Sequence, residues 1–268
     1  MYRDFFGLKE KPFNVTPDPK FLFFSKKHQE AFSHLIYGIK EKKGFIEITG
    51  EIGAGKTTLC RALLSCLDKK TKTALILNSN LPPTQMLRAI VGEFAITPNG
   101  KSKKALLDAL NRFLIEQLSL GCNVVLIVDE SQNLTPSMLE QIRLLSNLET
   151  EKEKLLQIIL VGQPELRDKL NLPSLKQLKQ RISVRYHIAS LDGMETEKYI
   201  FHRLKVAGSA GNIFFNGEAM DNIFGYSKGI PRLINMVCDK SLLAAYVMDT
   251  KKIDGEIISK CIEEIEGL

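Results

Sequence analysis

The sequence predicts an α/β protein that has a parallel-sheet core followed by a small helical domain. Up to about residue 190, short apolar runs rich in β-formers alternate with longer helical stretches. The runs at 123–128 and 156–161 are apolar at five of their six positions and do not alternate, which is typical of parallel strands buried on both faces. From Asp192 onward the pattern is helical only. We therefore expect a core over 1–190, with an N-terminal extension over 1–40, and a helical domain over 191–268.

The elements follow in chain order. We expect strands at the following ranges: 44–49, 73–78, 123–128, 156–161 and 183–188. We expect core helices at 56–67, 82–94 and 103–120, and C-terminal helices at 195–207, 217–227, 231–248 and 255–266. Asn216 and Asp254 suit N-caps of two of these helices, and Pro231 suits the first turn of another.

Composition sets broad limits. The chain has 268 residues, of which 44% are hydrophobic and 25% charged, and its net charge is +6, which allows an anionic partner without requiring one. No apolar run approaches the roughly 18 residues of a membrane span, and no signal peptide opens the chain, so we expect a cytoplasmic protein. The five cysteines contain no C-x-x-C pair, and the four histidines lack metal-ligand spacing. We expect free thiols in a reducing compartment and no zinc site.

A glycine-rich loop lies between the first expected strand and the next helix. It fits the pattern G-x-x-x-x-G-K-[ST], a P-loop, whose backbone N–H groups cradle phosphates beside a helix N-terminus. Lys56 would hold the β- and γ-phosphates, and the Thr57 hydroxyl would bind Mg²⁺. The alternative is a structural turn. The predicted nucleotide-binding residues are Gly50, Glu51, Ile52, Gly53, Ala54, Gly55, Lys56, Thr57 and Thr58.

Two carboxylates follow the apolar run at 123–128. Asp129 would lie at the carboxyl edge of the sheet, where it would bind Mg²⁺ through water. Glu130 would orient or deprotonate the attacking water. Carboxylates at a strand end can also simply form a turn. The chain lacks the N/T-K-x-D pattern by which GTPases bind the base, so the sequence favours ATP.

Three further side chains are candidates for the site. Gln163 follows the strand at 156–161 and would position the water if that strand lies between the two nucleotide-bearing strands. Arg181, or else Arg185, would reach a neighbouring subunit's site as an arginine finger. Arg232 opens a C-terminal helix and would touch the γ-phosphate of its own site. The alternatives are an exposed glutamine, a solvated basic face and a surface salt bridge, respectively.

Several short runs, spread over essentially the whole chain, resemble the ATPase region of the general secretion pathway protein A (ExeA-like) AAA+ ATPase family. They are Tyr2-x-x-Phe5-Phe6-Gly7-Leu8, Pro12-Phe13, Thr16-Pro17-Asp18-Pro19, Ser25-x-x-His28-x-Glu30-Ala31, Gly162-Gln163-Pro164-Glu165-Leu166, Gln180-Arg181-Ile182 and Gly229-Ile230-Pro231-Arg232. The resemblance implies an AAA+ fold with a C-terminal helical lid. It also implies Gln163 as sensor 1, Arg181 as the trans finger and Arg232 as sensor 2.

The resemblance further implies a process, namely ATP-driven assembly or remodelling of protein partners in type II secretion or a related envelope pathway. The expected partners are other copies of the chain, in an oligomer with shared sites, and an envelope protein. Full-length proteins of this kind continue into a membrane span and a peptidoglycan-binding domain, whereas this chain ends after the lid; membrane association would come only through such a segment. Transposition-type ATPases look similar over the same core, so a DNA-binding regulatory ATPase stays the alternative.

Overall fold

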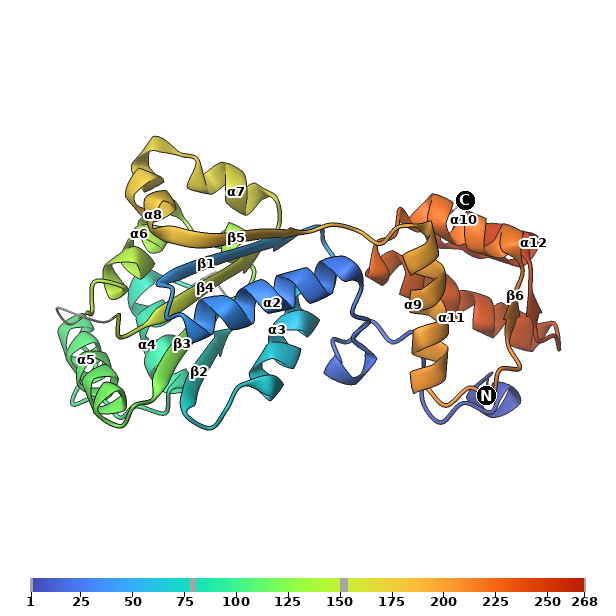
Figure 1. The fold of residues 1–268 in the computed structure, drawn as a ribbon. Coiled ribbons are helices and arrows are strands. Elements are labelled where there is room, and N and C mark those ends of the chain that lie inside the picture. Colours follow the sequence, from blue (N-terminus) through green and yellow to red (C-terminus); the bar gives the residue numbers. More distant parts are fainter. Residues whose placement is uncertain (1, 78–80, 150–153, 268) are drawn as a thin grey trace. The chain divides into compact units, whose positions relative to one another are not determined.

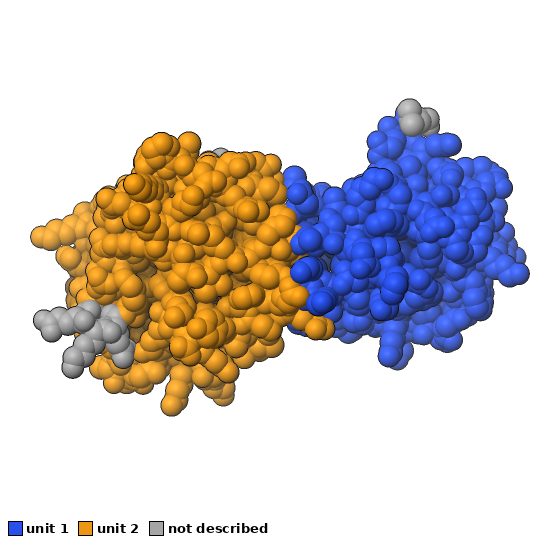
Figure 2. All heavy atoms as spheres, turned by 45° about the horizontal axis from the view of Figure 1, so that its top comes forward, with its two compact units in different colours: residues 1–28, 51–59, 189–268 blue, residues 29–50, 60–188 orange. Residues whose placement is uncertain are grey.

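The computed structural model describes residues 2–77, 81–149 and 154–267. The chain divides into two compact units (Figure 2). Unit 1 consists of Met1–His28, Glu51–Leu59 and Ala189–Leu268, and unit 2 of Gln29–Gly50 and Cys60–Ile188. The extension up to His28 and most of the P-loop therefore group with the C-terminal helices. The predicted division into a core and a lid at residue 190 stays a prediction.

Unit 2 is built on a five-stranded parallel sheet in the order β2-β3-β4-β1-β5 (Figure 1). Its strands are β1 (Phe45–Gly50), β2 (Thr71–Ile76), β3 (Asn123–Val128), β4 (Gln157–Gly162) and β5 (Ile182–Ile188). The predicted α/β fold with a parallel sheet is confirmed, and β4 lies between β1 and β3, the position that the hypothesis for Gln163 needs. The second strand begins and ends two residues earlier than predicted, and Asn78, which we assigned to it, lies outside the described residues.

Helices cover both faces of this sheet. On one face, α2 (Lys26–Lys40) packs against β1 and β5, since a Cβ added to Gly38 would lie 2.4 Å from Cδ1 of Ile46. The opposite face carries the larger apolar core. The remaining helices of the core are α3 (Lys56–Cys66), α4 (Pro83–Glu93), α5 (Lys103–Ser119), α6 (Pro136–Leu145), α7 (Glu165–Leu170) and α8 (Lys176–Arg181). Helices α2, α6 and α7 were not predicted, although buried apolar residues recur at helical spacing in α2 (Ala31, Leu35 and Ile39) and in α6 (Met138, Ile142 and Leu145).

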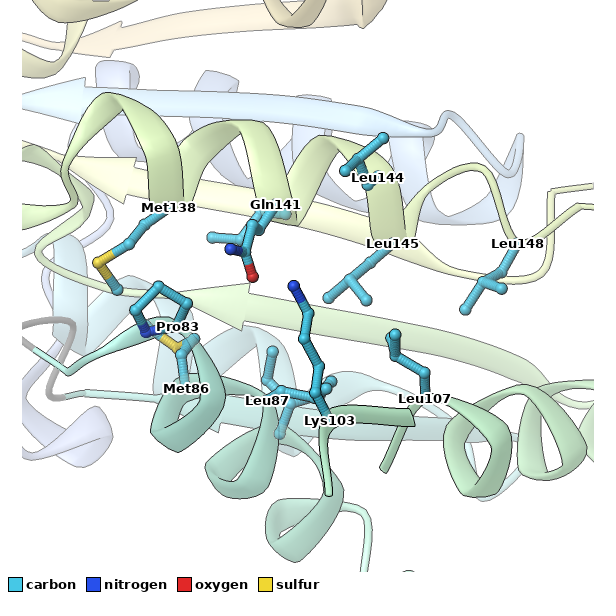
Figure 3. A pocket seen from close by; sticks show the side chains of 12 residues that line it. Pro83, Met86, Leu87, Lys103, Leu107, Met138, Gln141, Leu144, Leu145 and Leu148 are labelled. Atoms are coloured by element: carbon cyan, nitrogen blue, oxygen red, sulfur yellow. The ribbon is translucent and has the colours of Figure 1, made fainter. Parts of the chain in front are cut away.

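An apolar pocket of about 240 Å³ lies within unit 2, between α4, α5 and α6 (Figure 3). Its lining is mostly aliphatic, with Lys103 and Gln141 as the polar exceptions. It includes Met86, Leu87, Met138 and Leu145. None of the predicted site residues lines this pocket.

Unit 1 holds the C-terminal helices α9 (Gly193–Val206), α10 (Gly217–Ser227), α11 (Pro231–Val247) and α12 (Gly255–Glu266), together with α1 (Tyr2–Phe6). Asn216 and Asp254 cap α10 and α12 as predicted, by accepting the N–H groups of Ala219 and Ile257. The prediction that this region is helical only is wrong. Two short strands, β6 (Phe214–Phe215) and β7 (Lys252–Ile253), pair in parallel there, and two residues are too few to show a strand period.

The N-terminal extension shares its core with the C-terminal helices. Phe6, Phe13 and Phe21 belong to the same buried cluster as residues of α9, α10, α11 and α12. The guanidinium of Arg203, on α9, donates to the carbonyl of Asn14 at 3.1 Å and lies 4.7 Å from the centre of the Phe21 ring. This arginine therefore holds the extension against the first C-terminal helix.

The cysteines are free, as predicted, and three of them are buried: Cys60, Cys238 and Cys261. Over the described ranges 2–77, 81–149 and 154–267, no helix is both long and apolar enough to cross a membrane. Within the same ranges, no three His, Cys, Asp or Glu side chains gather into a group that would hold a metal ion.

Candidate functional site

The P-loop has the backbone that its glycines allow. Gly53 and Gly55 have φ angles of +81° and +90°, in a region that side-chain-bearing residues rarely enter. The N–H of Ala54 donates to the carbonyl of Glu51 at 3.1 Å, which closes a tight turn before α3 begins at Lys56. The loop thus curls back just before a helix N-terminus, as a phosphate cradle requires.

Lys56 is enclosed by the loop that precedes it. The residue is only 5% exposed, and its ammonium donates to the carbonyl of Glu51 at 2.9 Å. A lysine held over its own loop carries its positive charge to the place where the loop's N–H groups converge. The position fits the predicted role in phosphate binding.

Arg232 lies against the P-loop within unit 1. Its backbone N–H donates to the carbonyl of Gly53 at 3.3 Å, and its Cβ would lie 2.4 Å from a Cβ added to Gly53. Pro231 takes the first turn of α11, as predicted, so this helix starts beside the loop. A side chain at position 53 would push α11 away, and the glycine is therefore needed for contact as well as for its φ angle.

Asp129 and Glu130 follow β3 directly. Asp129 is 1% exposed, and its Oδ1 accepts the backbone N–H of Glu130 at 2.9 Å. Glu130 has a left-handed backbone, with φ of 52° and ψ of 36°. For a residue other than glycine such a conformation costs on the order of 1–3 kcal/mol and is concentrated at functional sites.

Two amides surround the Glu130 carboxylate. Gln132 Nε2 donates to its Oε2 at 2.5 Å, and Gln163 Nε2 donates to the same oxygen at 3.2 Å. Gln132 Oε1 in turn accepts the backbone N–H of Gln163 at 3.0 Å. Gln132 therefore ties the end of β4 to the segment after β3, and together the amides fix the direction of the carboxylate.

The ammonium of Lys169, on α7, holds the backbone around Gln132. It donates to the carbonyl of Gln132, and to that of Leu134 at 2.8 Å. Gly162 leaves the space that the cluster needs, since a Cβ there would lie 2.9 Å from Gln132 Oε1.

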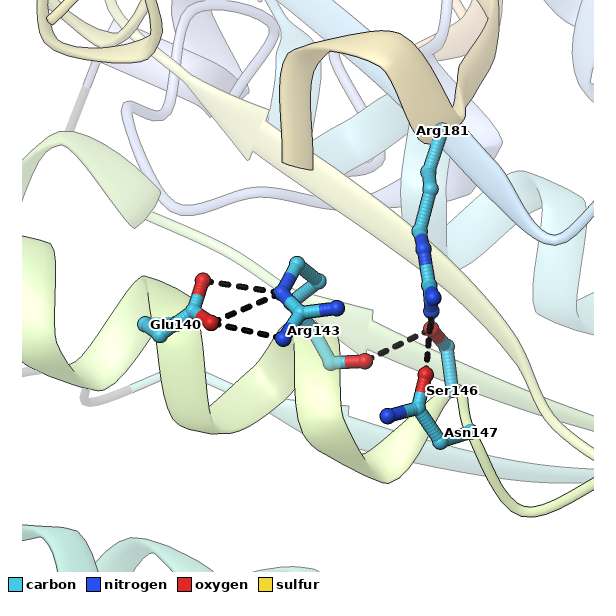
Figure 4. Close-up of polar contacts among 5 residues, drawn as sticks. All are labelled: Glu140, Arg143, Ser146, Asn147 and Arg181. Atoms are coloured by element: carbon cyan, nitrogen blue, oxygen red, sulfur yellow. Dashed lines mark hydrogen bonds and ion pairs between the residues drawn. The ribbon is translucent and has the colours of Figure 1, made fainter. Parts of the chain in front are cut away.

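Arg181 ends α8 just before β5 and contacts the end of α6 (Figure 4). Its Nη1 donates to Ser146 Oγ at 2.9 Å and to Asn147 Oδ1 at 2.5 Å. Ser146 Oγ also donates to the carbonyl of Arg143 at 2.7 Å, so its orientation is set by α6.

The other candidate finger, Arg185, is paired with a carboxylate of the neighbouring strand. Its Nε lies 3.2 Å from Oε2 of Glu47, on the neighbouring strand β1. Glu47 is 4% exposed, and burial raises its pKa while the Arg185 charge lowers it. Arg185 thus balances the charge of a buried carboxylate. Arg181, in contrast, donates to the neutral side chains of Ser146 and Asn147.

The structure brings the predicted residues together in two groups, one in each unit. The first is the P-loop with Arg232, and the second is Asp129 and Glu130 with Gln163. Two further residues contact these groups and were not predicted, namely Gln132 and His28. Gln132 follows Glu130 by two residues but carries no recognisable pattern, whereas His28 belongs to the run Ser25-x-x-His28, which we noted without a role.

The comparisons with known proteins agree with this fold. Residues 39–170 match the family model of the AAA domain. Over its whole length the chain is 45% identical to general secretion pathway protein A of Aeromonas hydrophila, and it covers 49% of that protein. The chain therefore spans about half the length of this relative.

Solved structures show the same fold at low identity. The ORC2 protein of Aeropyrum pernix superposes with a TM-score of 0.71 at 17% identity, over 96% of this chain and 72% of that one. Cdc6p of Pyrobaculum aerophilum gives a TM-score of 0.70 at 18% identity, over 94% and 70% of the two chains. The RuvB branch migration motor of Thermotoga maritima gives 0.56 at 17% identity, over 90% and 69%. These likenesses concern the fold alone.

Proposed function

We propose that this chain, which is ExeA-like over its whole length and carries an AAA domain, binds ATP with Mg²⁺ and hydrolyses it. The observation that carries this proposal is the order of the strand ends. β1 leads into the P-loop, β4 leads into Gln163, and β3 leads into Asp129, and these three parallel strands are neighbours. Ligands of such sheets bind at the carboxyl ends of the strands.

In the proposed site each residue has a distinct task. Residues Gly50–Thr58 hold the phosphates through backbone N–H groups, and Lys56 neutralises their charge. The Thr57 hydroxyl and the Asp129 carboxylate are oxygen donors of the kind that Mg²⁺ takes, and the ion would supply charge neutralisation on the phosphates. Glu130 accepts a proton from the attacking water while Gln163 holds that carboxylate in place. Phosphate release by the purified chain with ATP and Mg²⁺, abolished by a chelator, is the direct test.

The process follows from the relative and not from the site. The protein that this chain matches over the chain's whole length is general secretion pathway protein A. We therefore propose that the ATPase serves secretion and drives the assembly or remodelling of an envelope partner. Oligomers with shared sites are part of the same proposal, in which an arginine of one copy reaches the site of the next. Arg181 is the preferred finger, since Arg185 already compensates the buried Glu47 carboxylate.

If Arg181 acts on a neighbouring copy, specific ATPase activity rises with protein concentration. Arg181→Ala is expected to lower hydrolysis while ATP binding persists, because the arginine stabilises charge only in the transition state; fingers of this kind contribute about 10³–10⁵ in rate where best studied. The measurement is steady-state phosphate release over a range of protein concentrations. Lys176→Ala, an exposed change on the same helix, is the matched control. A rate that is independent of concentration and survives Arg181→Ala contradicts the finger.

The similarity to general secretion pathway protein A gives no support for DNA binding. We expect that the chain does not bind DNA and that DNA does not stimulate its ATPase activity. Its basic residues lie on helices that also carry acids, such as Asp108 and Glu116 on α5. Any attraction to duplex DNA is therefore expected to vanish near ~0.15 M salt, where the Debye length is about 8 Å. Fluorescence anisotropy of labelled duplex at low and physiological salt, beside ATPase rates with and without DNA, measures this. Tight binding at physiological salt with several-fold stimulation would promote the DNA-dependent alternative.

A further inference from the structure

A buried histidine contacts the backbone of the P-loop. His28 is 3% exposed, and its Nε2 lies 2.9 Å from the carbonyl oxygen of Ala54. A Cβ added to Gly55 would lie 3.2 Å from the same nitrogen. His28 thus contacts the peptide that joins Ala54 to Gly55, in the middle of the proposed phosphate cradle.

The hydrogen bonds fix which ring nitrogen carries the proton. A carbonyl oxygen only accepts, so Nε2 of His28 is protonated and donates to Ala54. The other nitrogen, Nδ1, lies 2.8 Å from Oγ of the buried Ser25, whose hydroxyl can donate to it. Burial lowers the pKa of His28, and this effect outweighs the opposing influence of the bond to Ala54 and of the Glu195 charge.

Ser25 also anchors this histidine to the chain around it. Its Oγ accepts the backbone N–H of His28 at 3.3 Å, as a helix N-cap does for α2. The next residue, Lys26, donates its backbone N–H to Oε1 of Glu195 at 3.2 Å, and Glu195 belongs to the capping box of α9. The histidine is therefore held by the first turn of one helix and, through Lys26, by the start of another.

The contact with His28 sets the orientation of the peptide between Ala54 and Gly55. In a planar trans peptide the C=O and the following N–H point in opposite directions. When the Ala54 carbonyl turns toward His28, the N–H of Gly55 turns away from it, in the direction that a phosphate-binding loop needs. A rotation of this peptide would reverse both groups, and it would meet little resistance, because Gly55 tolerates φ angles of either sign.

We propose that His28 is a positioning residue that locks the Ala54–Gly55 peptide with its N–H facing the nucleotide phosphates. Without this lock the loop would also populate the reversed peptide, which presents a carbonyl oxygen to the phosphates. The inference rests on the proposed nucleotide binding. It assigns a role to the run Ser25-x-x-His28, which the ATPase chemistry itself leaves unused.

Two amide substitutions that differ in reach test the proposal. The amide nitrogen of His28→Gln can take the place of Nε2 and donate to Ala54, whereas the amide of His28→Asn is one carbon too short. We expect His28→Asn to weaken equilibrium binding of ADP by about tenfold, on the scale of one lost hydrogen bond, and His28→Gln to stay within about twofold of wild type. Amide hydrogen exchange of 50–58 in the ligand-free protein is expected to rise in His28→Asn only.

The same change at His202, a histidine of α9, is the matched control. The ring of His202 contacts the ring of Phe23 and the backbone of Leu22, which lie outside the P-loop. His202→Asn should bind ADP like wild type, and thermal unfolding without nucleotide shows whether each variant is folded. ADP affinity in His28→Asn equal to that of wild type overturns the lock, and so does a folded His28→Gln that binds as weakly as His28→Asn. If the wild-type chain binds no ADP, the proposed function itself fails.

Discussion

Replacing Lys56 by alanine is expected to abolish measurable nucleotide binding. Lys56 is the side-chain cation of the P-loop, and its ammonium is held over the loop by the Glu51 carbonyl. Removing one partner of a buried charge pair costs several kcal/mol, so we expect the affinity for a fluorescent ATP analogue to fall by at least about 100-fold. Equilibrium titration of wild type and variant measures the effect.

Lys69→Ala is the control for this change, because it removes an exposed lysine just beyond the end of α3. The control should bind the analogue as wild type does. Binding by Lys56→Ala within a few-fold of wild type would mean that the phosphates bind elsewhere, and the P-loop assignment would then be wrong.

Replacing Glu130 by glutamine is expected to separate binding from hydrolysis. The amide keeps the size of the carboxylate but cannot take a proton from water, and general bases of this kind contribute about 10²–10⁴ in rate. We therefore expect turnover to fall by that factor while the affinity for ATP changes little. Phosphate release at saturating ATP, beside analogue titration, gives both quantities.

Glu116→Gln serves as the matched control, because this exposed glutamate of α5 lies outside both groups of site residues. Its turnover should equal that of wild type. Loss of ATP binding in Glu130→Gln would place the residue in the binding of nucleotide and not in the chemical step.

The sheet was predictable from the sequence because its central strands β1, β3 and β4 are buried. β3 and β4 contain the uninterrupted apolar runs Val124–Val128 and Ile158–Val161, and the ends of both strands were placed within one residue. Helices α2 and α6 carry apolar residues at helical spacing, so their local pattern also permitted a prediction that we did not make. The strands β6 and β7 exist through a pairing of segments far apart in sequence, which no local pattern reveals.

The candidate site was predictable where the chemistry is local in sequence. The P-loop, Asp129 and Glu130 are recognisable from spacing, and the structure shows the backbone that these residues need. Gln132 and His28 could not be assigned this way, because each acts on a group that another segment of the chain supplies. The side chain of Gln132 meets Gln163 only once β3 and β4 are in place, and His28 meets Ala54 only in the folded unit.

A single-turnover experiment tests the central claim, that this chain hydrolyses ATP through its P-loop and Glu130. Protein is held in excess over radiolabelled ATP with Mg²⁺, at a concentration high enough to favour association of copies, and ADP is followed with time. We predict that wild type converts the bound ATP to ADP while Glu130→Gln retains it as ATP. ATP recovered unchanged from wild type, or ADP formed by both proteins at the same rate, would contradict the claim.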